Sequence, residues 1–220
     1  MKRRRVFVTG ATGYLGRAVI PRLGERGHAV RALVRRGSEG RLPAGCEAVL
    51  GDALDAASFA ARVPPSDTFL QLVGVPHPSP AKAALFRSVD LASVRASAEA
   101  AAKAGVAHFV YVSLAHPAPV MSAYWQARAE GEEALRARGL HATILRPWYV
   151  LGPGHRWPYL LLPAYWLLER LPPTRPSARR LGLVTLVEMR EAIVTAVENP
   201  ATGIRIVEVP QIRAQGGAAG

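Results

Sequence analysis

Residues 9–16 read Thr-Gly-Ala-Thr-Gly-Tyr-Leu-Gly, and this stretch decides the fold. It continues the short apolar run Val6–Thr9, which is typical of a buried parallel strand, and it leads into apolar residues at helical spacing. Each glycine has a physical reason. Gly10 permits a tight exit from the strand, Gly13 lets the backbone approach a pyrophosphate, and Gly16 allows close packing of the helix.

The beginning of the predicted helix completes a phosphate site. Its free N–H groups and the positive end of its dipole point toward an anion bound at the turn. Because three glycines follow a strand and open a helix, the context matches that of a dinucleotide-binding turn. The candidate cofactor contacts are Gly10, Thr12, Gly13, Tyr14, Leu15 and Gly16.

Strand and helix patterns alternate along the rest of the chain. This order predicts an α/β fold of the Rossmann type, a doubly wound parallel sheet that binds ligands at the carboxyl ends of its strands. We expect strands at Val6–Thr9, His28–Val34, Ala48–Leu50, Phe69–Val75, Phe109–Ser113, Ala142–Leu145 and Ile204–Val209. One expected helix follows the glycine turn and ends at Gly27. The other expected helices cover Ser58–Arg62, Ala83–Lys103, Tyr124–Arg138 and Leu186–Glu198.

One domain over residues 1–210 accommodates these elements, and residues 211–220 are expected to form a flexible tail. Residues 148–185 break the alternation with proline, tryptophan and leucine clusters. This segment is interpreted as a substrate lid or dimer surface, or as a helix that lies on a membrane. Its apolar runs are shorter than the roughly 20 residues of a transmembrane helix.

Composition narrows the partners. The chain of 220 residues carries a formal charge of +12, which favours anionic ligands, but no zinc-finger, RNA-recognition or basic-zipper motif accompanies it, and no nucleic acid is expected. The single cysteine, Cys46, excludes an internal disulfide and fits a reducing cytoplasm. No cysteine and histidine cluster has the spacing of a metal site. A small-molecule substrate, a homodimer and weak contact with a membrane surface remain open.

Several short motifs beyond the glycine turn resemble landmarks of the short-chain dehydrogenase/reductase superfamily. The resemblance points to its atypical, NmrA-like branch, which includes an accessory subunit of respiratory complex I. It extends over about the first 155 residues and a late helix near Val187–Ile193. The motifs are Gly51-Asp52, Leu72-Val73-Gly74, Val89-Asp90-Leu91, Ala104-Gly105-Val106, Tyr124 with Arg128 and Glu132, and Leu145-Arg146-Pro147.

The end of the second strand bears on the choice of cofactor. An acidic residue there would hold the adenosine ribose hydroxyls, but the chain has Arg35 and Arg36. Because a guanidinium suits a 2′-phosphate, NADP(H) is favoured over NAD(H), and Arg35 is the better candidate. The alternative is that both arginines are solvated surface charges. The resemblance implies that Asp52 contacts adenine and that Val73 and Gly74 line the cofactor channel.

The resemblance also implies a set of catalytic residues. In active relatives a serine or threonine polarises the substrate carbonyl, a tyrosine donates a proton, and a lysine four residues later holds the ribose. Ser113 and Tyr124 fit the first two roles, whereas Arg128 stands at the lysine position and cannot exchange a proton. Active relatives often place the first donor one or two residues later, where this chain has Leu114 and Ala115. Two loop histidines, His116 and His155, are candidates for a missing donor.

Two functions therefore compete. The first is an NADP(H)-dependent oxidoreductase that acts on a small or apolar carbonyl or quinone-like substrate. The second is a non-catalytic protein that senses NAD(P)H or serves in assembly, with or without attachment to a membrane surface. The arginine at position 128 favours the second function, whereas the first function rests partly on the family resemblance.

Overall fold

A computed structural model describes residues 2–153, 168, 170–173 and 175–216. Seven parallel strands form one sheet in the order β3-β2-β1-β4-β5-β6-β9, which confirms the predicted Rossmann-type fold. The strand order reverses between β1 and β4, so the glycine turn lies at the point where such folds bind ligands. The strands are β1 (Arg5–Thr9), β2 (Ala29–Val34), β3 (Cys46–Leu50), β4 (Thr68–Gln71), β5 (His108–Val112), β6 (Ala142–Arg146) and β9 (Ile204–Glu208).

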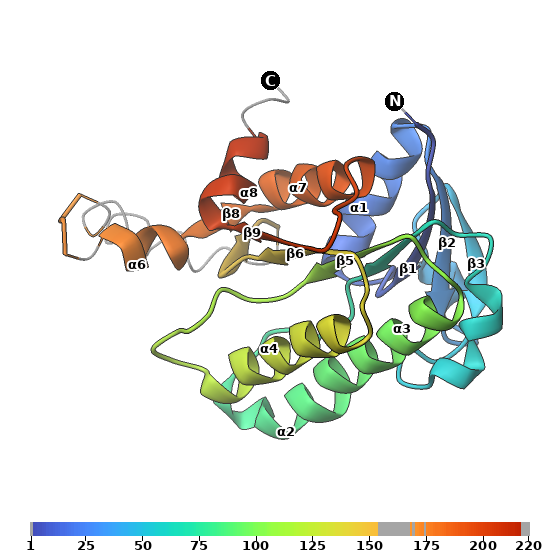
Figure 1. Cartoon of the computed structure of the whole chain (residues 1–220), viewed down its shortest axis with the longest axis horizontal. Coiled ribbons are helices and arrows are strands. Elements are labelled where there is room, and N and C mark those ends of the chain that lie inside the picture. Colours follow the sequence, from blue (N-terminus) through green and yellow to red (C-terminus); the bar gives the residue numbers. More distant parts are fainter. Residues whose placement is uncertain (1, 154–167, 169, 174, 217–220) are drawn as a thin grey trace.

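Helices cover both faces of the sheet (Figure 1). On one face lie α1 (Tyr14–Glu25), α7 (Leu186–Glu198) and α8 (Val209–Gly216), and on the other lie α3 (Ala92–Lys103) and α4 (Ser122–Ala137). The two faces differ in their core residues because successive strand side chains point to opposite sides. Phe7, Phe69 and Phe109 pack in a row beneath α3 and α4, with ring centroids 5.2 and 5.1 Å apart.

The long helix predicted over Ala83–Lys103 is interrupted. A three-residue α2 (Ala83–Leu85) passes into a π-helical turn, η5 (Phe86–Leu91), before α3 begins. Wide turns of this kind occur frequently at functional sites. Here the turn carries Asp90, whose side chain is fully buried.

Other elements are shorter than the sequence indicates. The predicted strand Phe69–Val75 ends at Gln71, because the chain beyond it leaves the ladder and the Val75 N–H bonds to Asp90 instead. The predicted helix Ser58–Arg62 is a pair of 3₁₀ turns, η2 (Ala56–Ser58) and η3 (Ala60–Arg62). Two further 3₁₀ turns are η1 (Glu39–Arg41) and η4 (Pro80–Lys82).

The C-terminal part contains elements that periodicity did not indicate. Within residues 148–185, β7 (Tyr149–Leu151) pairs with β8 (Leu183–Thr185), and α6 (Arg175–Arg180) lies between them in sequence. The lid, dimer and membrane interpretations of this segment depend largely on residues 154–167, 169 and 174, which lie outside the described residues. No helix among the described residues is both long and apolar enough to cross a membrane.

The prediction of a flexible tail over residues 211–220 is wrong for residues 211–216, which are helical. This stretch belongs to α8, which buries Val209 and Ile212 against the core on the α1 and α7 side. Two apolar side chains three residues apart give the helix a buried face despite its polar composition. Residues 217–220 lie outside the described part of the chain.

Candidate functional site

The three glycines of the turn have different surroundings. Gly10 has a φ of +79°, and a Cβ there would lie 2.6 Å from the carbonyl carbon of Leu72, the residue that follows β4. A Cβ on Gly16 would lie 2.6 Å from the Gly10 oxygen. These two glycines are therefore required by the fold itself. A Cβ on Gly13 would meet only the Gly10 oxygen, at 3.1 Å, so its small size leaves open space at the surface.

Gly13 is also the residue that begins α1. It is exposed and extended, and no side chain caps the first N–H groups of the helix. Uncapped N–H groups at a helix start bind anions readily. The turn therefore fits the pyrophosphate of a dinucleotide.

The side chains of the turn point in different directions. Thr12 is partly exposed, whereas Leu15 packs against the aliphatic core. Tyr14 places its hydroxyl where a Cβ on Gly152 would collide with it. The side chains of Leu15 and Tyr14 thus hold the turn against the protein, and their backbone N–H groups are the part available to a phosphate.

The next two strand ends carry the other expected cofactor contacts. Arg35 and Arg36 directly follow β2 and are exposed, and neither forms an ion pair or side-chain hydrogen bond within the described residues. Asp52 follows β3, and its Oδ1 accepts a hydrogen bond of 3.0 Å from the Leu54 N–H. These residues share the carboxyl edge of the sheet with the glycine turn.

A buried ion pair lies beneath the end of β4. The Arg128 guanidinium places Nη2 2.5 Å from Asp90 Oδ1, and its Nη1 donates to the Val112 carbonyl at 3.0 Å. A Cβ on Gly74 would collide with Arg128 Nη2, so the absence of a side chain at position 74 lets the guanidinium approach the backbone there. Asp90 is held from the other side by the Val75 N–H at 3.2 Å.

Burial alone would lower the pKa of Arg128, but its neighbours Tyr124, Tyr111 and Asp90 raise it, and the net direction is upward. Burial raises the pKa of the Asp90 carboxyl, and the charge of Arg128 opposes that shift. Arginine does not lose its proton in proteins. The site therefore contains a fixed positive charge whose counterion is already present.

Tyr124 stands in the first turn of α4, beside this pair. Its ring packs on Phe86 with centroids 4.6 Å apart, and Arg128 Nη2 donates to its hydroxyl at 3.4 Å. The Arg128 Cζ lies 5.4 Å from the centre of the phenol ring. The structure thus brings Tyr124, Arg128 and Gly74 together, and the catalytic roles expected of Tyr124 and Arg128 stay predictions.

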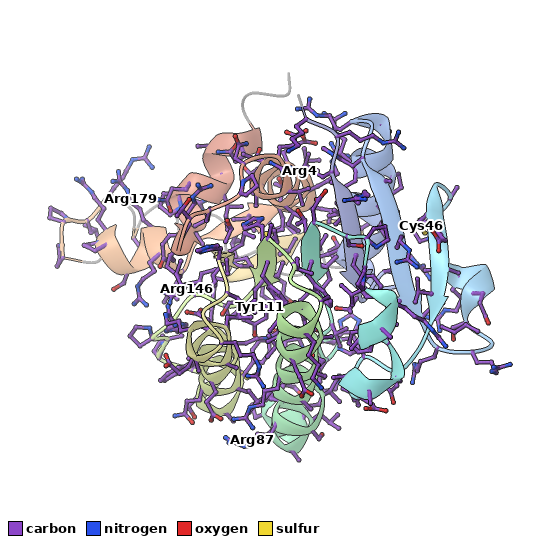
Figure 2. All side chains as sticks on the ribbon, turned by 45° about the vertical axis from the view of Figure 1, so that its right-hand side comes forward. Arg4, Cys46, Arg87, Tyr111, Arg146 and Arg179 are labelled. Atoms are coloured by element: carbon purple, nitrogen blue, oxygen red, sulfur yellow. The ribbon has the colours of Figure 1, made fainter. Side chains whose placement is uncertain are left out.

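Ser113 belongs to a different group of residues. It is buried at the end of β5, and its hydroxyl donates to Glu132 Oε1 at 2.7 Å. Arg146, the last residue of β6 (labelled in Figure 2), binds the same carboxylate of α4, with Nη2 2.6 Å from Oε2. In this geometry the Ser113 proton is directed at Glu132, so its predicted role toward a substrate carbonyl stays a prediction.

Glu132 organises this second group. Burial would raise the pKa of its carboxyl, but hydrogen bonds from His116, Arg146 and Ser113 lower it to about 2. The carboxylate is therefore ionised at neutral pH and acts only as an acceptor. Glu132 appeared in the sequence as a family landmark, and its spacing from Tyr124 and Arg128 places all three along one side of α4.

Asp90 was not among the predicted site residues. The sequence did contain a signal for Asp90, since it is an acidic residue within an apolar stretch of predicted helix. A carboxylate that is buried in such a place requires a charged or hydrogen-bonding partner. His155, by contrast, lies outside the described residues. Within the described residues no group of three or more potential metal ligands comes together.

Comparison with known proteins identifies relatives. A family model described as NAD(P)H-binding matches residues 10–156. A protein named ceramide reductase from Caulobacter vibrioides (strain NA1000 / CB15N) is 31% identical over 220 residues, and the match covers 96% of this chain. The chain spans 66% of the length of that relative.

Solved structures share the fold. The enzyme WbmH from Bordetella bronchiseptica, in complex with NAD⁺, has a TM-score of 0.69 and 20% identity, and the match covers 97% of this chain and 80% of that one. A short-chain dehydrogenase/reductase superfamily protein from Agrobacterium tumefaciens with bound NAD has a TM-score of 0.68 and 21% identity, with 97% and 83% covered. These structures confirm the predicted fold, and the family model shows that the chain is NAD(P)H-binding, while the preference for NADP(H) stays a prediction.

Proposed function

Because the chain belongs to the NAD(P)H-binding family, we propose that it is a reductase of the short-chain dehydrogenase/reductase type that acts on a carbonyl group. One observation carries the proposal. The Tyr124 phenol is held against the Arg128 guanidinium, beneath Gly74, at the sheet edge shared with the glycine turn. When bound, NAD(P)H supplies a hydride to the carbonyl carbon.

The chain itself supplies the proton. Tyr124 donates its O–H proton to the carbonyl oxygen, so that the C=O group becomes CH–OH and the phenol becomes phenolate. The charge of Arg128 stabilises that phenolate, and a proton from solvent restores the phenol. Arg128 does not take part in proton transfer, since its guanidinium stays protonated.

NADP(H) is the proposed cofactor. Support comes from Arg35 and Arg36, which are exposed where the adenosine ribose would end and whose side chains have no ion pair or hydrogen bond among the described residues. Their planar donors suit a phosphate. The two solved relatives described above hold NAD, so the arginines carry this part of the proposal.

The proposed substrate is a small or apolar carbonyl compound of lipid-like character. Support comes from the relative named ceramide reductase, because a ceramide is a lipid. Leu168 and Leu171, which follow β7 in the sequence, are large apolar side chains that are exposed. Exposed apolar side chains are compatible with an apolar ligand.

Single-turnover oxidation of NADPH, followed at 340 nm with a panel of long-chain ketones and quinones, tests the proposed function. Wild-type protein is expected to reduce at least one ketone. Tyr124→Phe should slow that step about 10²- to 10⁴-fold with nearly unchanged NADPH affinity. Tyr149→Phe, a change of the same chemistry in β7, is the matched control and should keep the rate. A Tyr124→Phe protein as fast as wild type contradicts the mechanism.

The alternative is a non-catalytic protein that senses NAD(P)H or serves in assembly. Two observations favour it. Arg128 already bonds to Asp90 and Val112, and the Ser113 hydroxyl is directed at Glu132, so two groups of the expected relay are engaged within the protein. Under this alternative NADPH binds but no ketone in the panel is reduced.

A further inference from the structure

The loop that follows β5 turns its polar donors inward. The Ser113 hydroxyl and His116 Nε2 both meet Glu132 Oε1, at 2.7 and 3.1 Å. Leu114 and Ala115, which lie between them, are buried and have no polar side-chain atom. This strand end therefore offers no hydroxyl donor to a ligand at the edge of the sheet.

Glu132 fixes the position of the proton on His116. An ionised carboxylate can only accept, so the hydrogen of the imidazole must be on Nε2. Arg146 binds the same carboxylate, with Nη2 2.6 Å from Oε2. In the neutral ring, Nδ1 then carries a lone pair and acts as an acceptor.

The geometry leaves Nδ1 available. The imidazole stacks on Trp125, with centroids 6.1 Å apart and planes 16° apart, and its side chain is 17% exposed. Nothing in the described part of the chain hydrogen-bonds to Nδ1. Trp125 directly follows Tyr124 in α4, so the ring packs beside the first turn that carries the proposed proton donor.

Several charged groups surround the pair. Glu132 and Arg136 belong to α4, Arg146 comes from β6, and Arg180 of α6 donates to the carbonyl of Pro117, the residue after His116. Arg136 and Arg146 pair with Glu132 and also with Glu133 and Glu208, respectively, and Arg180 bonds to the backbone. Glu132 thus positions the imidazole through Nε2, and Nδ1 on the opposite side of the ring has no partner in the described part of the chain.

We propose that His116 determines substrate specificity: its Nδ1 accepts a hydrogen bond from a hydroxyl or amide N–H next to the carbonyl that is reduced. The inference rests on the proposed reductase function and adds a class of substrate to it, ketones with a neighbouring donor. A site built to bond a substrate hydroxyl discriminates against the analogue that lacks it, because its own acceptor is left unpaired.

Nitrogen NMR of the full chain with NADP⁺ tests the inference without turnover. In wild-type protein, His116 should show a protonated Nε2 and an unprotonated Nδ1 at neutral pH. Saturating 1-hydroxy-2-octanone should shift the Nδ1 resonance, whereas 2-octanone should leave it in place. Glu132→Gln, whose amide can donate to Nε2, should move the proton to Nδ1. A proton on Nδ1 in wild-type protein, or equal responses to both ketones, overturns the inference.

Turnover gives a second readout. The ratio of kcat/KM for 1-hydroxy-2-octanone over 2-octanone should be about tenfold in wild-type protein and close to one in His116→Phe, which keeps an aromatic ring on Trp125. His77→Asn, a change at an exposed loop histidine, should keep the ratio. An unchanged ratio in His116→Phe overturns the inference while the reductase function stands. If wild-type protein reduces neither ketone, the proposed function fails for these substrates, and the NMR result alone decides on His116.

Discussion

Arg128 Nη2 and Asp90 Oδ1 lie 2.5 Å apart in the interior, one residue on α4 and the other in the π-helical turn before α3. The Asp90 side chain is fully buried and that of Arg128 is 7% exposed, so each charge depends on the other for compensation. The pair connects the two helices directly beneath Gly74. A change at any of these three positions is therefore expected to affect the proposed cofactor channel and Tyr124 together.

Gly74→Ala tests this connection. The added Cβ would collide with Arg128 Nη2, so we expect displacement of the guanidinium, weaker NADPH binding and a slower reductive step. Gly24→Ala is the control, because a Cβ in that part of α1 meets nothing within 4 Å and should raise stability by roughly 0.5–1 kcal/mol. Calorimetric titration with NADPH measures the effect. Wild-type affinity in a folded Gly74→Ala protein would show that Arg128 lies elsewhere.

Gly13→Val should abolish dinucleotide binding and leave the fold intact. The branched side chain would fill the open space at the turn, where its only close protein neighbour is the Gly10 oxygen at 3.1 Å. Gly10→Val should instead prevent folding, since its Cβ would overlap the backbone of Leu72. Circular dichroism and titration with NADPH and NADH distinguish the two outcomes. A folded Gly13→Val protein with normal binding contradicts the interpretation of the turn.

Arg35→Asp should reverse the cofactor preference. Wild-type protein is expected to bind NADPH more tightly than NADH, and a carboxylate at this position should repel the 2′-phosphate. Arg179→Asp makes the same change in charge on α6, where the side chain extends away from the body of the molecule (Figure 2), and should leave the preference unchanged. Equal affinities for both cofactors in wild-type protein and in Arg35→Asp would exclude Arg35 as the determinant.

Sequence periodicity predicted the local elements well where local interactions decide them. The helix expected over Leu186–Glu198 has these bounds in the structure, because Thr185 accepts from the Glu188 N–H and the Glu188 side chain accepts from the Thr185 N–H. The glycine turn was predictable because it, too, is determined by residues that are close together in the sequence.

The features that could not be predicted from the sequence depend on contacts between segments that are far apart in the chain. Asp90 becomes a site residue only when α4 brings Arg128 to it, and the inward turn of Ser113 depends on Glu132, 19 residues later. The α8 helix is stabilised because Val209 and Ile212 pack into the core on the side of the sheet that α1 and α7 cover. Such pairings depend on tertiary packing, which periodicity along one segment does not describe.

Stability should fall as the pH drops from about 6.5 to about 4, and His108 is one cause. Burial lowers the pKa of this histidine to about 4, so the folded protein keeps it neutral, hydrogen-bonded to Thr143, while the unfolded chain takes up a proton below pH 6.5. The difference corresponds to about 3 kcal/mol. In urea titrations across this range, His108→Gln should show a smaller loss than wild type, and His77→Asn the same loss. Equal losses in all three proteins would assign the effect to other groups.

Arg128→Lys separates the reductase from the sensor. In a reductase the ammonium restores the group that active relatives use beside the tyrosine, so the substitution should keep or raise the rate of NADPH oxidation, provided that the shorter donor set still holds Asp90. Arg128→Ala should lower that rate and weaken NADPH binding, and it should destabilise the protein by roughly 3–5 kcal/mol, because Asp90 is left as an unpaired buried charge. In a sensor, Arg128→Ala should still weaken NADPH binding, while neither substitution changes the rate of NADPH oxidation, because wild-type protein already has none.

Single-turnover absorbance at 340 nm, calorimetric titration and urea unfolding of wild-type protein, Arg128→Lys and Arg128→Ala give the rate, the affinity and the stability. A reductase whose rate is lost in Arg128→Lys at full stability would show that the planar guanidinium itself is needed to orient Tyr124.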